Sequence, residues 1–287
     1  IEHHVLSMSG EMEERVIGPF VEEYRKGRTP NPCILCNEHI KFRALVDSLA
    51  ASGMDLLATG HYARIEDVDS VPALARPKDR SKDQTYFLFS VDRERLGRVI
   101  FPLGELTKDE VRKVAAEAGL PVSEKPESQD VCFWPEGGGP AFFESRGIGS
   151  VPGDILSTGG EVIGRHEGIV RYTIGQRRGM GVAAPEPLYV ISIDPESNTI
   201  VAGTVDHLFS KSLTARPVNF LPEETGGRAE AKIRYGHGPE PCEFTLKGEA
   251  LEVTFDEPQK AITPGQSVVL YRDDIVIGGG VIERQNE

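Results

Sequence analysis

Three cysteines are the residues whose type and spacing most directly suggest chemistry. Cys33 and Cys36 form a CxxC pair, and Cys132 lies much further along the chain. A CxxC at a helix start is typical of thiol redox sites, whereas a structural zinc site needs four ligands and no second CxxC is present. The three thiols could also hold an iron–sulfur cluster with one iron left open, although their spacing does not demand it. Thiol chemistry, zinc and a cluster all stay open at this point.

A second segment, Lys82-Asp83-Gln84-Thr85-Tyr86, combines charged, amide and aromatic side chains. One interpretation is a helix start, in which Asp83 caps the helix and the aromatic residues pack. The other is a nucleic-acid contact, in which lysine binds phosphate, glutamine reads a base edge and tyrosine stacks. Taken by itself, the segment favours the helix start.

Composition limits the class of protein. The 287 residues are enough for two or three domains, and 39% hydrophobic and 27% charged residues are ordinary for a globular chain. No apolar run has the length of a membrane span, and the start lacks the pattern of a signal peptide. Four cysteines are too few for a disulfide scaffold, which favours a reducing, cytoplasmic setting. We expect Cys242, in a strand-like segment, to be structural.

The net charge of −13 argues, taken alone, against a nucleic-acid binder. Net charge describes the whole surface, however, and local basic clusters occur at residues 25–28, 78–82 and 177–178. The simplest interpretation of these clusters is scattered, solvated charge. If they share one face, they would form a phosphate track on an otherwise acidic body.

The elements that must position the first cysteines have an α/β pattern. Apolar spacing predicts a helix over residues 11–26, interrupted by Pro19 and ended by Gly27. The rigid segment at residues 29–32 follows, and Asn37 is expected to cap the next helix. That helix would turn Ile40, Ala44, Leu45 and Leu49 inward and end at Gly53.

A short buried strand is predicted at residues 56–59. Gly60 and His61 would lie beyond its carboxyl end, where ligands bind in α/β sheets. A hairpin is expected through residues 63–65 and 73–76. Thr107 to Glu110 form a capping box that opens a helix with an apolar face, and that helix stops at Gly119 and Pro121.

The composition then changes. Residues 137–140 look like a linker, and from Ile155 onward the pattern is β-like and rich in glycine. Alternation at 251–255 and 268–270, with a turn at Asp273-Asp274, predicts a small closed barrel. We therefore expect an α/β domain at 1–136, a small, mostly β central domain at 137–208 and a C-terminal β-barrel at 209–287. No GxxxxGK[S/T] phosphate loop is present.

Several of these segments together resemble one family, the tRNA-specific 2-thiouridylases (the MnmA/TrmU family). They are Gly27-Arg28-Thr29-Pro30-Asn31-Pro32-Cys33-x-x-Cys36-Asn37, Ala58-Thr59-Gly60-His61-Tyr62-Ala63-Arg64, Lys82-Asp83-Gln84-Thr85-Tyr86-Phe87-Leu88, Ser128-Gln129-Asp130-Val131-Cys132-Phe133, Tyr172-Thr173-Ile174-Gly175-Gln176-Arg177-Arg178-Gly179, Arg234-Tyr235 and Thr263-Pro264-Gly265-Gln266. The resemblance implies an ATP-pyrophosphatase (adenine nucleotide alpha hydrolase-like) domain, a central domain and a barrel. The family's Ser-Gly-Gly-x-Asp-Ser phosphate loop has no match here, so we expect the first α/β domain to be partial and the chain to be truncated.

The resemblance also implies a reaction and its residues. The family adenylates the C2 oxygen of the wobble uridine with ATP, and sulfur from a persulfide then attacks C2. Cys132 matches the cysteine that carries the persulfide, and Cys36 matches the nucleophile or resolving thiol that pairs with it in a disulfide. Gly60 matches an ATP contact. The tRNA contacts implied by the resemblance are Asn31, Pro32, Cys33, His61, Lys82, Asp83, Gln84, Arg234, Tyr235 and Gln266.

One departure concerns Cys33, where some members of the family have Asp. The third thiol leaves open a [4Fe–4S] cluster with Cys33, Cys36 and Cys132 as ligands. The expected partners are tRNA and a persulfide sulfur-donor protein, with no membrane. Two alternatives to a thiolating enzyme stay open: a truncated tRNA-binding module without adenylation activity, and a CxxC iron–sulfur or redox protein.

Overall fold

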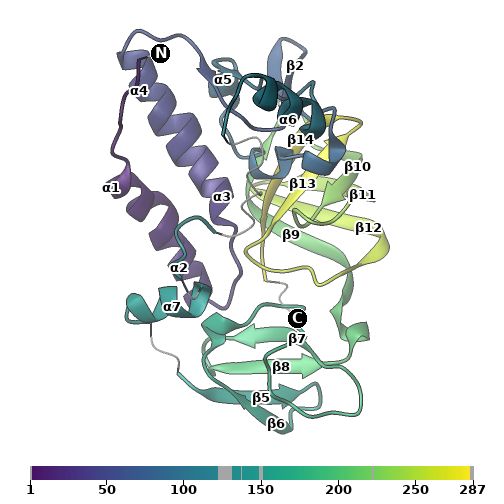
Figure 1. The fold of residues 1–287 in the computed structure, drawn as a ribbon. Helices are drawn as coiled ribbons and strands as arrows, with labels where there is room; N and C mark the ends of the chain where they lie inside the picture. The colour runs from purple at the N-terminus through teal and green to yellow at the C-terminus, as the bar shows by residue number, and fades with distance from the viewer. Residues whose placement is uncertain (1, 122–130, 137, 149–150, 222, 285–287) are drawn as a thin grey trace.

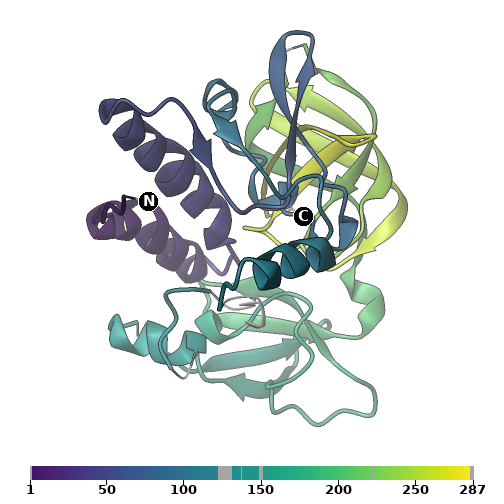
Figure 2. The ribbon, with the colours of Figure 1, turned by 45° about the horizontal axis from the view of Figure 1, so that its top comes forward.

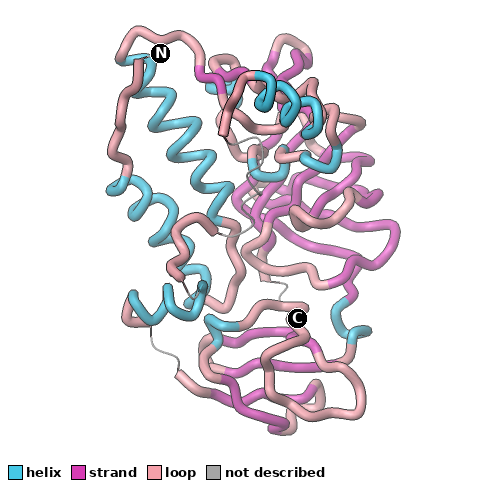
Figure 3. Tube along the Cα trace, viewed as in Figure 1, coloured by secondary structure: helices cyan, strands magenta, loops and turns pink. Residues whose placement is uncertain are grey.

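A computed structural model of the chain describes all residues except 1, 122–130, 137, 149–150, 222 and 285–287. The N-terminal helices lie beside a β-barrel, and a smaller four-stranded sheet lies at one end of both (Figure 1). When the chain is coloured by secondary structure, the long N-terminal helices lie on one side of the molecule and the barrel strands on the other (Figure 3). The mixed α/β architecture with a C-terminal barrel is therefore confirmed.

The first helix keeps its path through Pro19 by changing its winding. It runs as α1 (Ser9–Met12), a π-helical segment (Glu13–Ile17) and α2 (Gly18–Arg25). Proline has no backbone N–H to donate, and a wider π turn just before it accommodates that loss. Gly27, with φ of +67°, ends the helix as predicted. The buried side chains are Val16, Ile17, Phe20 and Val21.

The second helix begins earlier than predicted. It runs as α3 (Pro32–Leu35), a π-helical segment (Cys36–Ala44) and α4 (Leu45–Ala51). Its cap is Asn31, whose side chain accepts from the Cys33 amide, while Asn37 lies inside the helix. The predicted cap was therefore wrong, because Pro at the first helical position and Asn before it already form a favourable start. The buried residues are Pro32, Ile34, Asn37, Phe42 and Val46, rather than the predicted inward set of Ile40, Ala44, Leu45 and Leu49.

The remaining α/β part is small. Strands β1 (Leu57–Ala58) and β4 (Val99–Ile100) pair in parallel, and α5 (Arg93–Leu96) precedes β4. The capping box predicted for α6 (Lys108–Glu117) is confirmed, but no side chain of this helix is buried and its apolar face is open. Of the helices that the structure describes, none is long and apolar enough to cross a membrane.

Six strands close the C-terminal barrel. They are β9 (Phe209–Phe220), β10 (Gly226–Lys232), β11 (Glu240–Lys247), β12 (Ala250–Lys260), β13 (Ser267–Arg272) and β14 (Ile275–Ile282). The order β13-β10-β11-β12-β9-β14 is closed by pairing of β13 with β14. The predicted hairpin, β2 (Arg64–Val68) and β3 (Val71–Ala75), extends this sheet beyond β14 through Ile275 and Ala75. The hairpin therefore joins the barrel and not the α/β sheet (Figure 2).

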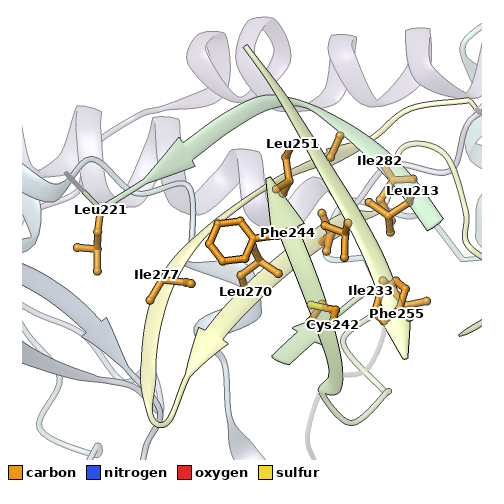
Figure 4. Packing of buried hydrophobic residues seen from close by; sticks show 14 of the residues in the cluster. Leu213, Leu221, Ile233, Cys242, Phe244, Leu251, Phe255, Leu270, Ile277 and Ile282 are labelled. Carbon is orange, nitrogen blue, oxygen red and sulfur yellow. The ribbon is translucent and has the colours of Figure 1, made fainter. Parts of the chain in front are cut away.

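The predicted alternation fills the barrel interior. Leu251, Val253 and Phe255 point inward, where they meet Cys242 and Phe244 (Figure 4). All five are at most 2% exposed. Burial in this apolar interior raises the pKa of Cys242 to about 12, so its thiol is inert at neutral pH. The structural role predicted for Cys242 agrees with this position.

Strand β13 has a second buried face that alternation did not reveal. Val268 and Leu270 point into the barrel, while Val269 and Tyr271 pack outward against Tyr86 in a second apolar cluster. This outer layer joins the barrel wall to the α/β part. The segment at residues 82–88 rests on this surface.

The central sheet has the order β6-β5-β8-β7. Its strands are β5 (Gly153–Ser157), β6 (Val162–His166), β7 (Tyr189–Asp194) and β8 (Thr199–Gly203). The linker predicted at 137–140 was wrong at residues 138–140, because Gly138–Ser145 form helix α7. Gly137 lies outside the described residues. Phe142 and Phe143 of α7 pack on Phe20 of the first helix, which explains why a glycine-rich start still folds into a helix.

Candidate functional site

A short strap, residues 27–31, leads into the helix that carries Cys33 and Cys36. The Thr29 amide donates to the Pro264 carbonyl at 2.9 Å, and its carbonyl accepts from Gln266 Nε2 at 2.7 Å. The Thr29 hydroxyl meets that of Thr173 in the central domain at 3.4 Å. Gly265 allows this approach, because a Cβ there would lie 2.9 Å from the Thr29 nitrogen. The strap is therefore held by both the barrel and the central domain.

Cys33 and Cys36 lie on the first turns of the helix that this strap anchors, which we call the thiol helix (residues 32–51). Cys33 is exposed, Cys36 is half-buried, and both are free thiols. Cys132 is exposed and free, and its charge acts on both other thiols, raising their pKa, so it lies within electrostatic range of them. The three cysteines that the sequence singled out therefore lie in the same region of the protein. Ser128, Gln129 and Asp130 of the Cys132 motif lie outside the described residues.

Lys41 is the cation of this thiol cluster. Burial is the main cause that raises the pKa of Cys33 and Cys36, and the charge of Lys41 partly counters it. In an α-helix, residues five apart point about 140° away from each other. The π winding from Cys36 to Ala44 bonds residues five apart, and it therefore turns Lys41 toward the side of Cys36.

His61 lies at the other side of Lys41. Its Nε2 is 3.5 Å from Lys41 Nζ, and its Nδ1 is 2.9 Å from the Thr59 hydroxyl. Burial and the charge of Lys41 lower the pKa of His61 to about 4, so the ring is neutral at pH 7. A neutral ring can accept a hydrogen bond from the lysine ammonium and orient it.

Gly60 lies at the carboxyl end of β1, as predicted. It is exposed, and a Cβ there would meet only Leu103 at 3.8 Å, an ordinary contact. The chain's own packing therefore does not require glycine at this position. A ligand that approaches the backbone closely would require it.

The segment from Lys82 to Gln84 is held mostly by its own side chains. Asp83 is 3% exposed, pairs with Arg76 at 3.0 Å and accepts from the amide and hydroxyl of Thr85. Gln84 Oε1 accepts from the Tyr62 amide at 2.8 Å, which ties it to the residue after His61. Short 3-10 turns at Arg80–Lys82 and Thr85–Phe87 replace the predicted helix start. Asp83 is a buried structural anion in this conformation.

Arg234 and Tyr235 lie in the loop between β10 and β11. Arg234 donates to the Ala261 carbonyl and to the Thr263 hydroxyl, so its guanidinium braces the loop that carries Gln266. Tyr235 is 41% exposed and stacks on Phe87, with ring centroids 4.3 Å apart. The Phe87 carbonyl accepts from Asn37 Nδ2 at 3.0 Å, which connects this aromatic pair to the thiol helix.

The basic clusters noted in the sequence differ in their pairing. Arg25 pairs with Glu22, and Lys26 and Arg28 both pair with Glu23. Lys78 pairs with Glu110 and Arg80 with Asp274. In the part of the chain that the structure describes, the side chains of Arg177 and Arg178 have no ion-pair or hydrogen-bond partner.

Metal binding was one of the possibilities left open for the cysteines. Among the described residues, no group of three or more His, Cys, Asp or Glu side chains is arranged to hold a metal ion. Cys33, Cys36 and Cys132 are free thiols, and the charge of Lys41 acts on the two helix thiols.

The fold and these residues define a class: an α/β domain with accessible thiols, followed by a small β domain and a six-stranded barrel. Family models match each part, as "tRNA methyl transferase HUP domain" over residues 1–136, "tRNA methyl transferase PRC-barrel domain" over 142–204 and "Aminomethyltransferase beta-barrel domain" over 210–282.

Curated relatives match over nearly the whole chain. The tRNA-specific 2-thiouridylase MnmA 1 of Syntrophus aciditrophicus is 47% identical over 99% of this chain and 76% of its own length. The tRNA-specific 2-thiouridylases MnmA of Geobacter metallireducens and Pelobacter propionicus are 48% and 47% identical, over 78% and 81% of their lengths. The chain belongs to the MnmA family of tRNA-specific 2-thiouridylases.

Sequence reasoning missed several residues of this site. Lys41 carried a usable signal, because it is a cation on the thiol helix, but its alignment with Cys36 depends on π winding. Arg76, Asn37 and Phe87 carried none, since their roles arise from contacts between segments far apart in the chain.

Proposed function

We propose that this protein catalyses 2-thiolation of a uridine in tRNA, at the wobble position, with ATP and a persulfide sulfur donor. The observation that carries the proposal is that two free thiols and Lys41 lie on the helix after a strap held by two other domains, with the free thiol of Cys132 within electrostatic range. The names of the relatives give the substrate and product class.

In the proposed reaction, Cys132 carries the persulfide on an exposed position that a donor protein can reach. ATP supplies the adenylyl group that makes the C2 oxygen of uridine a leaving group, and the exposed Gly60 backbone suits close approach of the nucleotide. The terminal sulfur attacks C2 and AMP departs. The Cys36 thiol then attacks Cys132 Sγ, which releases 2-thiouridine and leaves a Cys36–Cys132 disulfide for an external thiol to reduce.

Burial keeps the helix thiols protonated at neutral pH, so a nearby positive charge favours the thiolate that must attack. Lys41 supplies that charge, and neutral His61 orients it. We assign both residues a supporting role in the thiol step. Cys33, which replaces an acidic residue found in some relatives, is the third thiol of the cluster and no part of this proposal requires it to transfer sulfur.

The tRNA contacts are proposed in two groups. His61, Lys82, Gln84 and Tyr235 reach the surface or lie just beneath it and are proposed to touch RNA. Asp83, Arg234 and Gln266 are engaged with the protein itself, and Asn31 caps the thiol helix with Pro32 buried beside it. We propose that this second group positions the strap, the loops and the thiol helix against the RNA. A cytoplasmic location stays a prediction.

The test is a thiolation assay with unmodified tRNA, ATP and a persulfide-donor protein. Cys132→Ser and Cys36→Ser should each lower product by at least about a thousandfold, the scale of losing a nucleophile, while tRNA binding persists. Cys242→Ala is the matched control, because this cysteine lies inside the barrel, and it should retain activity. Full activity of Cys132→Ser would refute the assignment.

The same assay separates the alternatives. Salt-dependent tRNA binding by the wild-type chain without any product would favour a binding module that cannot adenylate. Iron-dependent visible absorbance after anaerobic purification would favour a cluster protein. Product from this chain excludes the binding-module alternative.

A further inference from the structure

One charged loop of the central domain contributes only Thr173 to the site described above, and its two arginines have no role there. It runs from Tyr172 to Gly179, between the 3-10 turn Ile169–Arg171 and strand β7, and contains Arg177 and Arg178. Both arginines are exposed, and each keeps its charge unneutralised within the described residues, unlike the paired cations at 25–28.

The backbone that presents these arginines is braced. Gln176 uses both ends of its amide, since Oε1 accepts from the Thr173 amide at 3.1 Å and Nε2 donates to the Arg178 carbonyl at 2.9 Å. The Gly175 amide and the Gln176 carbonyl also bond Val190 of β7, at 2.8 and 3.0 Å. A loop held this way presents its side chains without a large ordering cost on binding.

The loop lies next to the strap. Thr173 meets Thr29 through their hydroxyls at 3.4 Å, and a Cβ on Gly175 would lie 3.0 Å from the Ala261 side chain. Arg177 also borders an open hollow of about 430 Å³, whose walls are small and apolar residues together with Glu186. The loop that carries the two guanidinium groups therefore contacts, through Thr173, the segment that positions Cys33 and Cys36. We call the Arg177-Arg178 part of this braced loop the ridge.

The two exposed arginines stand out electrostatically, because the protein as a whole has a net charge of −13. The overall charge repels a polyanion, so attraction must come from local positive charge. Guanidinium groups bind phosphate through paired N–H donors, and such contacts fix register rather than read sequence.

We propose that Arg177 and Arg178 form a phosphate-binding ridge that grips the sugar–phosphate backbone of the tRNA beside its target uridine. This proposal rests on the proposed function and adds a binding site in the central domain. The ridge positions the RNA against the thiol helix and contributes no group to the sulfur-transfer step.

The experiment measures tRNA affinity at several salt concentrations for the full chain. Arg177→Gln/Arg178→Gln should weaken binding about tenfold and reduce the slope of log affinity against log salt by roughly one to two. At saturating tRNA the thiolation rate should stay near wild type, while KM for tRNA rises.

The matched control is Arg112→Gln/Lys113→Gln, an adjacent and exposed basic pair on α6 that removes the same charge. This control should leave affinity and slope unchanged. If the control loses as much affinity as the ridge variant, the loss follows from the change in net charge and not from the two arginines, and the ridge is refuted. If the ridge variant binds like wild type, the ridge is refuted while the proposed function stands; absence of wild-type binding would overturn both.

Discussion

The two faces of strand β13 show two ways of building a protein interior. Val268 and Leu270 point into a barrel core made almost entirely of apolar side chains. On the opposite face, the Tyr271 hydroxyl lies 3.1 Å from the Thr85 hydroxyl, and Tyr86 donates to the Ser267 carbonyl at 2.9 Å. The outer layer is as well buried as the inner one, but it is organised by hydrogen bonds.

The difference has a functional meaning. An apolar core is non-directional and tolerates many arrangements of similar volume, whereas buried polar groups with specific partners fix orientation. The segment at residues 82–88 lies on the hydrogen-bonded face. Asp83 and Asn37 are buried with polar partners on this side, and Asn37 connects the segment to the thiol helix, so this face helps to set the position of that helix.

The largest expected contrast between the two sides is in thiol reactivity. Cys242 is fully buried in the barrel, whereas Cys33 is exposed and Cys36 half-buried on the opposite side. Iodoacetamide should alkylate the two helix thiols of the native protein at least about a thousandfold faster than Cys242, which reacts only after opening of the barrel. Because burial raises the pKa of both helix thiols, their labelling should keep rising as the pH passes 9.

Mass spectrometry of digested samples reports this labelling site by site. In guanidinium chloride all four cysteines should react, which controls for their intrinsic reactivity. Native labelling of Cys242 at a rate close to that of Cys36 would mean that the barrel interior is not sealed.

The next contrast is in stability. Asp83→Ala removes one partner of a buried ion pair and leaves Arg76 uncompensated, which should lower the free energy of unfolding by roughly 3–5 kcal/mol. Asp256→Ala breaks the exposed pair with Arg228 on the barrel surface and should leave the free energy of unfolding almost unchanged, because water and salt screen an exposed pair. Urea titrations of both variants measure the difference. Equal losses would contradict the idea that the outer face is held by specific polar contacts.

The smallest effect concerns pH. An unfolded histidine takes up a proton near pH 6.5, whereas the lowered pKa of His61 delays this to about 4 in the folded protein. Between these values the unfolded state binds more protons, so stability falls as the pH decreases from 6.5 toward 4. Thermal unfolding of His61→Gln should show a shallower loss over this range than wild type. His3→Gln, an exposed control, should follow wild type.

Much of the fold could be predicted because its signals are local. Strand alternation predicted the barrel interior, and the Thr107–Glu110 capping box predicted the start of α6. The helix start at Asn31 had a local signal, an Asn followed by Pro, which the prediction of Asn37 as the cap overlooked. The second buried face of β13 and the attachment of β3 to the barrel had no such signal. Each depends on contacts between segments distant in sequence, for which one chain offers no periodic signal.

The candidate site divides similarly. The three cysteines were predictable from type and spacing, and they lie in the same region of the protein. The roles of Asp83, Arg234 and Gln266 were harder, because a polar side chain in a motif looks the same whether it faces RNA or the protein. Burial and hydrogen-bond partners distinguish the two, and these come only from the folded chain.

The strap at residues 27–31 precedes the thiol helix, so the start of this helix is positioned by whatever holds the strap. Its start is registered to the barrel through Thr29 and to the central domain through Thr173. A shift of either domain would therefore be transmitted to the cysteines as a displacement. The distance between the sulfur atoms and the RNA then depends on the positions of the thiol helix, the barrel and the central domain together. The geometry of the proposed reaction is therefore set by all three domains and not by the helix alone.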